Sequence, residues 1–225
     1  DNGDNGDNGD NGDNGDNGFI DIGEYCLNKL KPIIKQKSKG YQSNIFFFEV
    51  SNKINNLVNK KINVNLENII VKKKFIDIKD KLTDKLGGSK GQMEREVNSL
   101  LKLYKKPHFP ILLSKKDMCI YMSYCGIPLN NDNIPNNWKE QIMKIIKSLK
   151  RCNISNNDMW KNNFLVHNNI IHLVDFGWAT NEHYFPYINI TEKDISNYNN
   201  FIELLDFVYQ RVVKQRIMFR NKLLN

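Results

Sequence analysis

The sequence has few cysteines and no long apolar run. Its four cysteines form no Cys-x-x-Cys pair and fit no zinc-binding pattern, so we expect reduced thiols in a reducing compartment. No apolar run reaches the roughly 18 residues that a membrane-spanning helix needs, so we expect no membrane span. The sequence starts with neither a Met nor a signal peptide, so we expect the chain to be a piece of a longer one.

Residues 1–18 contain no proline and consist of six copies of Asp-Asn-Gly. A collagen triple helix requires glycine at every third position, because only glycine fits at its crowded axis. The tract therefore predicts either the end of a collagen-like stalk, which would make the chain a homotrimer, or a disordered acidic tail. It resembles the Gly-Asp-Asn-type triplets in collagen-like proteins of giant DNA viruses. That resemblance implies a viral protein of the virion or host cytoplasm; otherwise we expect a cytoplasmic protein.

Positive charge dominates the remainder of the chain. The net charge of the whole chain is +8, and residues 1–18 hold six Asp and no Lys or Arg, so residues 19–225 carry +14. Such charge favours anionic partners, including nucleotides, phosphorylated or acidic substrates and nucleic acid, although for charge alone a lysine-rich solvated surface is the better explanation. No motif that interleaves aromatic and basic residues supports nucleic-acid binding, so we do not expect nucleic acid as the partner.

The spacing of apolar residues predicts an α+β fold. The segment Asn52–Asn68 is largely polar and rich in Asn, so it is expected to be a loop or insertion. Strands are expected at Phe46–Val50, Ile69–Phe75, Cys119–Tyr124, Asn163–Val166 and Ile170–Val174, the last two as a hairpin. Helices are expected at Gln92–Leu103, at Trp138–Leu149 and, as one helix or two, at Asp194–Leu224.

One stretch carries a clear chemical pattern. Asp158 is followed five residues later by Asn163, and the expected hairpin then leads to Asp175-Phe176-Gly177. Phosphoryl transfer needs metal ions that neutralise the phosphates and a carboxylate that orients the attacking hydroxyl. Asn163 and Asp175 would bind Mg²⁺, which prefers oxygen ligands, and Asp158 would accept the proton of the hydroxyl. The pattern therefore predicts a site for ATP and Mg²⁺.

This order of residues resembles the catalytic loop and Asp-Phe-Gly motif of the protein-kinase-like superfamily. The resemblance implies a two-lobed kinase-like domain over residues 19–225, with an N-lobe at about 30–122 and a minimal C-lobe at about 126–225. Ile69-Ile70-Val71-Lys72 resembles the strand that carries the phosphate-binding lysine. Lys72 would contact the phosphates, and Glu96 would hold Lys72 by an ion pair. Lys73 and Lys74 leave the register open, and Glu94 is an alternative to Glu96.

The resemblance also implies where a nucleotide would bind. Ser38–Ile45 aligns with the family's glycine-rich loop, in which Gly40 is the one glycine kept and Ser43 replaces another. Tyr121–Gly126 aligns with the hinge, with Met122 at the gatekeeper position and Tyr124 beside the adenine. Asp194 would either bond the backbone of the catalytic loop or cap a helix.

Three features depart from the family pattern. Asn156 stands where the family usually has His, Trp160 stands where Ser/Thr kinases have Lys, and only 48 residues follow Gly177, without an Ala-Pro-Glu motif. These departures favour a compact atypical kinase that acts on a small molecule, lipid, sugar or single protein partner. The alternative is a non-catalytic, kinase-derived head on a collagen-like viral surface fibre, with a structural or interaction role.

Overall fold

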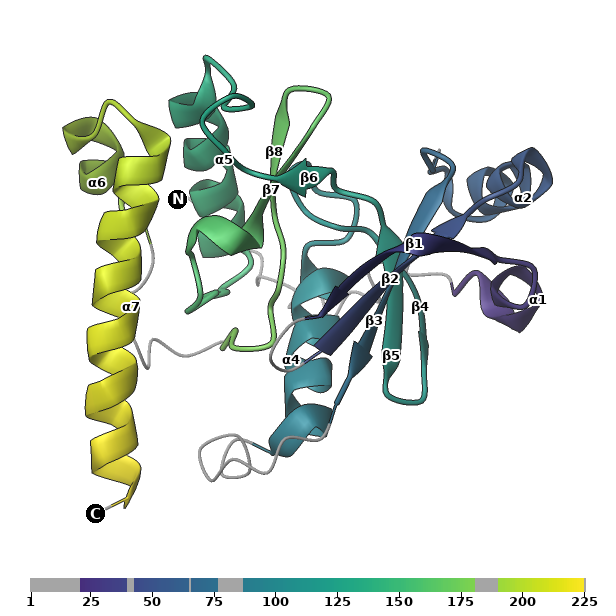
Figure 1. Cartoon of the computed structure of the whole chain (residues 1–225), viewed down its shortest axis with the longest axis horizontal. Coiled ribbons are helices and arrows are strands. Elements are labelled where there is room, and N and C mark those ends of the chain that lie inside the picture. The colour runs from purple at the N-terminus through teal and green to yellow at the C-terminus, as the bar shows by residue number, and fades with distance from the viewer. Residues whose placement is uncertain (1–20, 40–42, 65, 77–86, 181–189, 225) are drawn as a thin grey trace, which may run out of the picture.

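The computed structural model describes residues 21–39, 43–64, 66–76, 87–180 and 190–224. These residues form an α+β fold with two antiparallel sheets, which confirms the α+β part of the expected fold class. The Asp-Asn-Gly tract at 1–18 and Gly40 lie outside the described residues. Figure 1 shows the larger sheet at one end of the molecule and the long C-terminal helix at the other.

The larger sheet has five strands in the order β1-β2-β3-β5-β4. β1 is an edge strand, and this is why the sheet tolerates Pro32, which has no N–H to donate. β3 is central and pairs with β2 on one side and with β5 on the other. The bounds are β1 Lys31–Lys39, β2 Ser43–Glu49, β3 Ile69–Phe75, β4 Leu112–Lys116 and β5 Cys119–Ser123.

Helices cover both faces of this sheet. α4 (Gly88–Lys102) packs on one face, and α1 (Gly23–Leu27) and α2 (Asn52–Ile62) lie on the other. Successive side chains of a strand point to opposite faces, so neighbouring residues of β3 belong to different cores. Ile70 packs in the core beneath α1 and α2, whereas Val71 packs in the core beneath α4.

The loop expected at Asn52–Asn68 is wrong, because its first eleven residues form α2. Ile54, Val58 and Ile62 recur every four residues and are all buried, which is the spacing of one helix face. The side chain of Ser51 caps the helix by accepting a hydrogen bond from the backbone N–H of Ile54. Three of the four Asn residues of α2 are exposed, and the high Asn content conceals this pattern.

The second sheet has three strands, β6 (Ile127–Pro128), β7 (Phe164–His167) and β8 (Ile170–Leu173). β7 and β8 form the expected hairpin, whose two turn residues Asn168 and Asn169 both have positive φ, as a type I′ turn requires. Gly126 leads into this sheet at φ +103°, and a Cβ atom there would lie 2.0 Å from the carbonyl oxygen of Val166. Only glycine fits that approach.

Three helices complete the fold: α5 (Trp138–Arg151), α6 (Glu192–Asn197) and α7 (Phe201–Leu224). The C-terminal segment is thus two helices. Thr191 caps α6, and Asp194, the third residue of the helix, completes the capping box and also accepts from Arg211 of α7 at 2.8 Å. Asp194 is therefore not the N-cap itself. No helix within the described ranges is both long and apolar enough to cross a membrane.

Candidate active site

A buried lysine on β3 lies between two carboxylates. Lys73 Nζ is 2.6 Å from Oε2 of Glu96 on α4 and 2.9 Å from Oδ1 of Asp175, which follows β8. The side chains of Lys73 and Glu96 are only 5% and 1% exposed, whereas that of Asp175 is 38% exposed. This ion-pair cluster joins three segments that are far apart in sequence.

The expected role of Lys72 in this ion pair is wrong, and Lys73 takes its place. Lys72 lies on the opposite face of β3, where its Nζ is 5.4 Å from the centre of the Tyr121 ring. Lys74 is exposed and does not replace it. The choice of Glu96 over Glu94 as the paired carboxylate is confirmed, because Glu94 is exposed on the solvent side of α4.

The electrostatics of the cluster keep Lys73 charged. Burial alone would lower the pKa of Lys73, but the carboxylates of Asp175 and Glu96 outweigh burial and raise that pKa above its ordinary value. Burial raises the pKa of Glu96, and the Lys73 ammonium opposes that rise. The cluster therefore presents a fixed positive charge beside a partly exposed carboxylate.

Asn163 connects Asp158 to the chain that leads to Asp175. The amide nitrogen of Asn163 donates to the backbone oxygen of Asp158 at 2.8 Å and to Oδ2 of the same residue at 2.9 Å. The backbone oxygen of Asn163 accepts from the N–H of Val174 at 2.9 Å. The structure thus brings together the three residues that the sequence pattern selected, Asp158, Asn163 and Asp175.

Asn156 is a second connector, and the sequence argument did not assign it a role. It is fully buried; its Nδ2 donates to the backbone oxygen of Asp175 at 3.0 Å, and its Oδ1 accepts from the N–H of Asp158 at 3.0 Å. Asp175 has φ +62°, a left-handed conformation that is strained for a residue other than glycine. Asn156 therefore fixes two functional segments by one side chain. Its position two residues before Asp158 was the available signal.

The remaining expected site residues that the structure describes lie in the large sheet or directly after one of its strands. Ser43 is buried at the start of β2, and Met122 is buried in β5 within the core that also holds α4. Tyr124 follows β5 and makes edge-on ring contacts with Phe47 and His167. Their proposed contacts with a nucleotide stay predictions. Trp160, which departs from the family pattern, stacks on Tyr209 of α7 at 5.1 Å between ring centres.

The oxygen donors present suit Mg²⁺. Within the described residues, no three His, Cys, Asp or Glu side chains gather as a complete metal cage. Mg²⁺ does not need such a cage, since it is commonly held by one or two protein oxygens together with phosphate oxygens and waters. The Asn163 amide nitrogen is committed to Asp158, which leaves the amide oxygen as the atom for a cation. That oxygen and the Asp175 carboxylate fit such a site.

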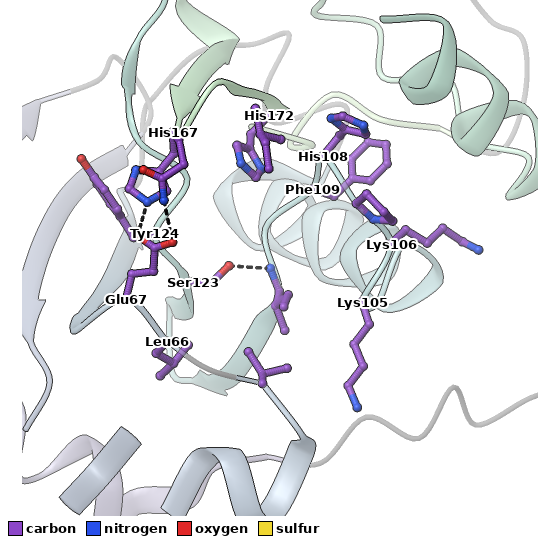
Figure 2. A pocket seen from close by; sticks show the side chains of 15 residues that line it. Leu66, Glu67, Lys105, Lys106, His108, Phe109, Ser123, Tyr124, His167 and His172 are labelled. Carbon is purple, nitrogen blue, oxygen red and sulfur yellow. Dashed lines mark hydrogen bonds and ion pairs between the residues drawn. The ribbon is translucent and has the colours of Figure 1, made fainter. Parts of the chain in front are cut away.

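A cavity of about 290 Å³ lies apart from this cluster, and none of Lys73, Glu96, Asp158, Asn163 or Asp175 lines it. Figure 2 shows its rim, where the Glu67 carboxylate accepts from His167 and Asn168 and so ties the chain before β3 to the β7–β8 turn. Burial lowers the pKa of His172 in this cavity to about 4. The lining residues come from 64–67, 105–111, 123–124 and 167–172.

No protein-family model and no curated protein sequence matches this chain. The interpretation of the site therefore depends on its own geometry and chemistry.

Proposed function

We propose that the chain is an ATP- and Mg²⁺-dependent phosphotransferase with a compact, kinase-like two-lobed fold. The observation that carries the proposal is the buried Lys73, held between Glu96 and Asp175. Removing charges from water is costly, and apolar residues usually stabilise a core better than a buried ion pair does. A charged cluster that persists in a core beside a strained, partly exposed Asp is thus better explained by a role in binding.

The chemistry of the proposed reaction assigns a task to each residue. Lys73 contacts Asp175 directly. Phosphate oxygens of ATP would take the place of Asp175 as the anionic partner of Lys73, and Glu96 would keep Lys73 in position. Asp175 and Asn163 would then hold Mg²⁺, which when bound neutralises phosphate charge. Asp158, oriented by Asn163, would accept the proton of the attacking hydroxyl.

The two sheets would supply the two lobes. The five-stranded sheet with α4 would form the nucleotide-binding N-lobe, with Ser43, Met122 and Tyr124 near the base and phosphates. The three-stranded sheet with α5, α6 and α7 would form the minimal C-lobe. The phosphate acceptor would be a small molecule, a lipid, a sugar or a single protein partner.

Nucleotide binding and transfer by the whole chain test the proposal. Calorimetric titration with ADP should show binding that requires Mg²⁺, and incubation with radiolabelled ATP should show turnover or autophosphorylation. In Asp175→Ala, ADP binding should no longer depend on Mg²⁺ and phosphoryl transfer should be lost. Asp132→Ala, at an exposed loop residue, should behave as the wild type. Absence of both binding and transfer in the intact wild-type protein would refute the proposal.

The Asp-Asn-Gly tract supports a second candidate, a non-catalytic head on a collagen-like viral fibre. In this function the tract would trimerise three chains and the domain would bind a partner. Sedimentation of a chain extended by many more triplets should give a trimer, and a monomer would count against a fibre. The two functions are compatible, because a fibre could carry an active enzyme.

A further inference from the structure

Side chains from two segments hold the chain that follows Asp175. Arg95 of α4 donates from Nε to the backbone oxygen of Gly177 at 2.8 Å. Asn157 donates from Nδ2 to the backbone oxygen of Trp178 and to Oγ1 of Thr180, both at 3.0 Å. Ser155 and Thr180 also exchange two backbone hydrogen bonds, at 2.9 and 3.0 Å. These contacts fix residues 177–180 against the segment that carries Asp158.

This support matters because Asp175 occupies a strained backbone conformation. Its φ of +62° costs free energy for a residue with a side chain, less for Asp than for most, so the surrounding structure helps to hold it. On its N-terminal side, Val174 is fixed by its hydrogen bond to Asn163. On its C-terminal side, the bonds from Arg95 and Asn157 supply the restraint. Loss of the hydrogen bonds on either side of Asp175 would let its backbone relax and would move its carboxylate away from Lys73.

We propose that Asn157 and Arg95 are positioning residues, which fix the Asp175 carboxylate opposite Lys73 before any ligand binds. The part of this proposal that concerns Mg²⁺ rests on the proposed phosphotransferase function. Both residues act on Asp175 through their hydrogen bonds to residues 177–180. The site would therefore be assembled by hydrogen bonds within the fold.

Asn157 is well suited to this role. Its side chain is 3% exposed, and its amide provides donors for Trp178 and Thr180 together with an acceptor for the Ser155 hydroxyl at 2.6 Å. Its own φ is +62°, a region that Asn tolerates better than most residues. Asn157→Gly keeps this backbone conformation but removes the amide, and Asn157→Asp keeps the acceptor but removes the donors. Together the two variants separate the hydrogen bonds from backbone strain.

The first experiment needs no nucleotide. Amide hydrogen exchange of peptide 174–180 is measured by mass spectrometry in the ligand-free whole chain. Asn157→Gly and Asn157→Asp should each exchange at least about tenfold faster, because one buried hydrogen bond accounts for about tenfold and both variants lose the two that Asn157 donates. Arg95→Lys, which loses the Nε donor, provides an independent variant should either Asn157 variant fail to fold. Asn153→Gly is the matched control, since Asn153 has φ +50° and is exposed; it should leave the peptide unchanged.

The second experiment measures the Mg²⁺ concentration that half-saturates ADP binding. It should rise about tenfold in the Asn157 variants and in Arg95→Lys, and stay unchanged in Asn153→Gly. A purely structural role would lower the unfolding midpoint without moving this Mg²⁺ dependence. Unchanged exchange and unchanged Mg²⁺ dependence in folded variants would overturn the positioning role. Failure of wild-type protein to bind ADP with Mg²⁺ would instead refute the phosphotransferase function, and exchange alone would then decide whether the restraint exists.

Discussion

Replacement of Lys73 by Met separates the structural and functional roles of the buried cluster. The change leaves Glu96, which is 1% exposed, and Asp175 without the cation that faces both of them. Removing one partner of a buried ion pair typically costs about 3–5 kcal/mol, because the other charge stays buried and unpaired. A domain of ordinary stability has roughly 5–15 kcal/mol to lose, so Lys73→Met should be folded but much less stable.

The double variant Lys73→Met, Glu96→Met isolates the cause of that loss. Apolar residues of similar volume in place of a buried pair are often neutral or stabilising, so the double variant should recover most of the lost stability. Asp175 alone stays half-exposed and can be hydrated. Urea unfolding, followed by tryptophan fluorescence, gives the free energy of unfolding for each variant. Glu96→Met alone completes the cycle. The summed losses of unfolding free energy in Lys73→Met and Glu96→Met, minus the loss in the double variant, measure the coupling between Lys73 and Glu96.

Transfer should not recover with stability. Losing one preorganised charge at a reacting phosphate costs about 10²- to 10³-fold in rate, so Lys73→Met and the double variant should both be nearly inactive. Lys72→Met and Lys74→Met are matched controls on the same strand, and each should change stability by less than about 0.5 kcal/mol. An active Lys73→Met beside an inactive Lys72→Met would refute the assignment. A double variant no more stable than Lys73→Met would refute the explanation by an unpaired charge.

Two further predictions concern the fold. The pKa of His172 is about 4 in the folded chain and about 6.5 when unfolded, so from pH 6.5 down to 4 the unfolded state gains a proton that the folded state cannot bind. Stability should fall over that window by up to about 3 kcal/mol; unfolding of His172→Phe should show a flatter pH dependence. Gly126→Ala should cost about 3 kcal/mol or more, because its Cβ would overlap the Val166 carbonyl. Gly23→Ala, also at positive φ but in open space, measures the backbone strain alone by thermal unfolding, and equal losses would contradict the steric explanation.

Much of the candidate site follows from local sequence. Asp158 and Asn163 are five residues apart in one loop. The Asn-Asn dipeptide between two apolar runs predicts the hairpin that leads to Asp175. Contacts between residues close in sequence are therefore enough to bring Asp158, Asn163 and Asp175 together. Asn156 is different, because its bond to the backbone of Asp175 spans nineteen residues and depends on how two segments pack. The position of Asn156 two residues before Asp158 draws attention to it, but no local pattern specifies the backbone atom that it contacts.

The error at Lys72 has a definite physical origin. A strand has a side-chain period of two, so a shift of one residue moves a side chain to the other face of the sheet. Similarity to a sequence motif aligns residue types and does not specify which face of the sheet a side chain occupies. With three successive lysines, residue type alone does not decide which one takes the position of the motif lysine. Glu96 was easier, because it lies on the buried face of α4 with Met93, Val97 and Leu100, whereas Glu94 lies on the exposed face of the same helix.

Alternation along β3 could have resolved the choice between the lysines. Val71, Lys73 and Phe75 share one face at positions i, i+2 and i+4, and all three are buried. Lys73 is thus the one lysine of the three with an apolar neighbour on each side of it on its own face, and its Nζ lies 5.1 Å from the centre of the Phe75 ring. A lysine in that setting needs an anionic partner in the core. Because Glu96 is the acidic residue on the buried face of α4, the pattern of two elements together predicts the pair that motif alignment misplaced by one residue.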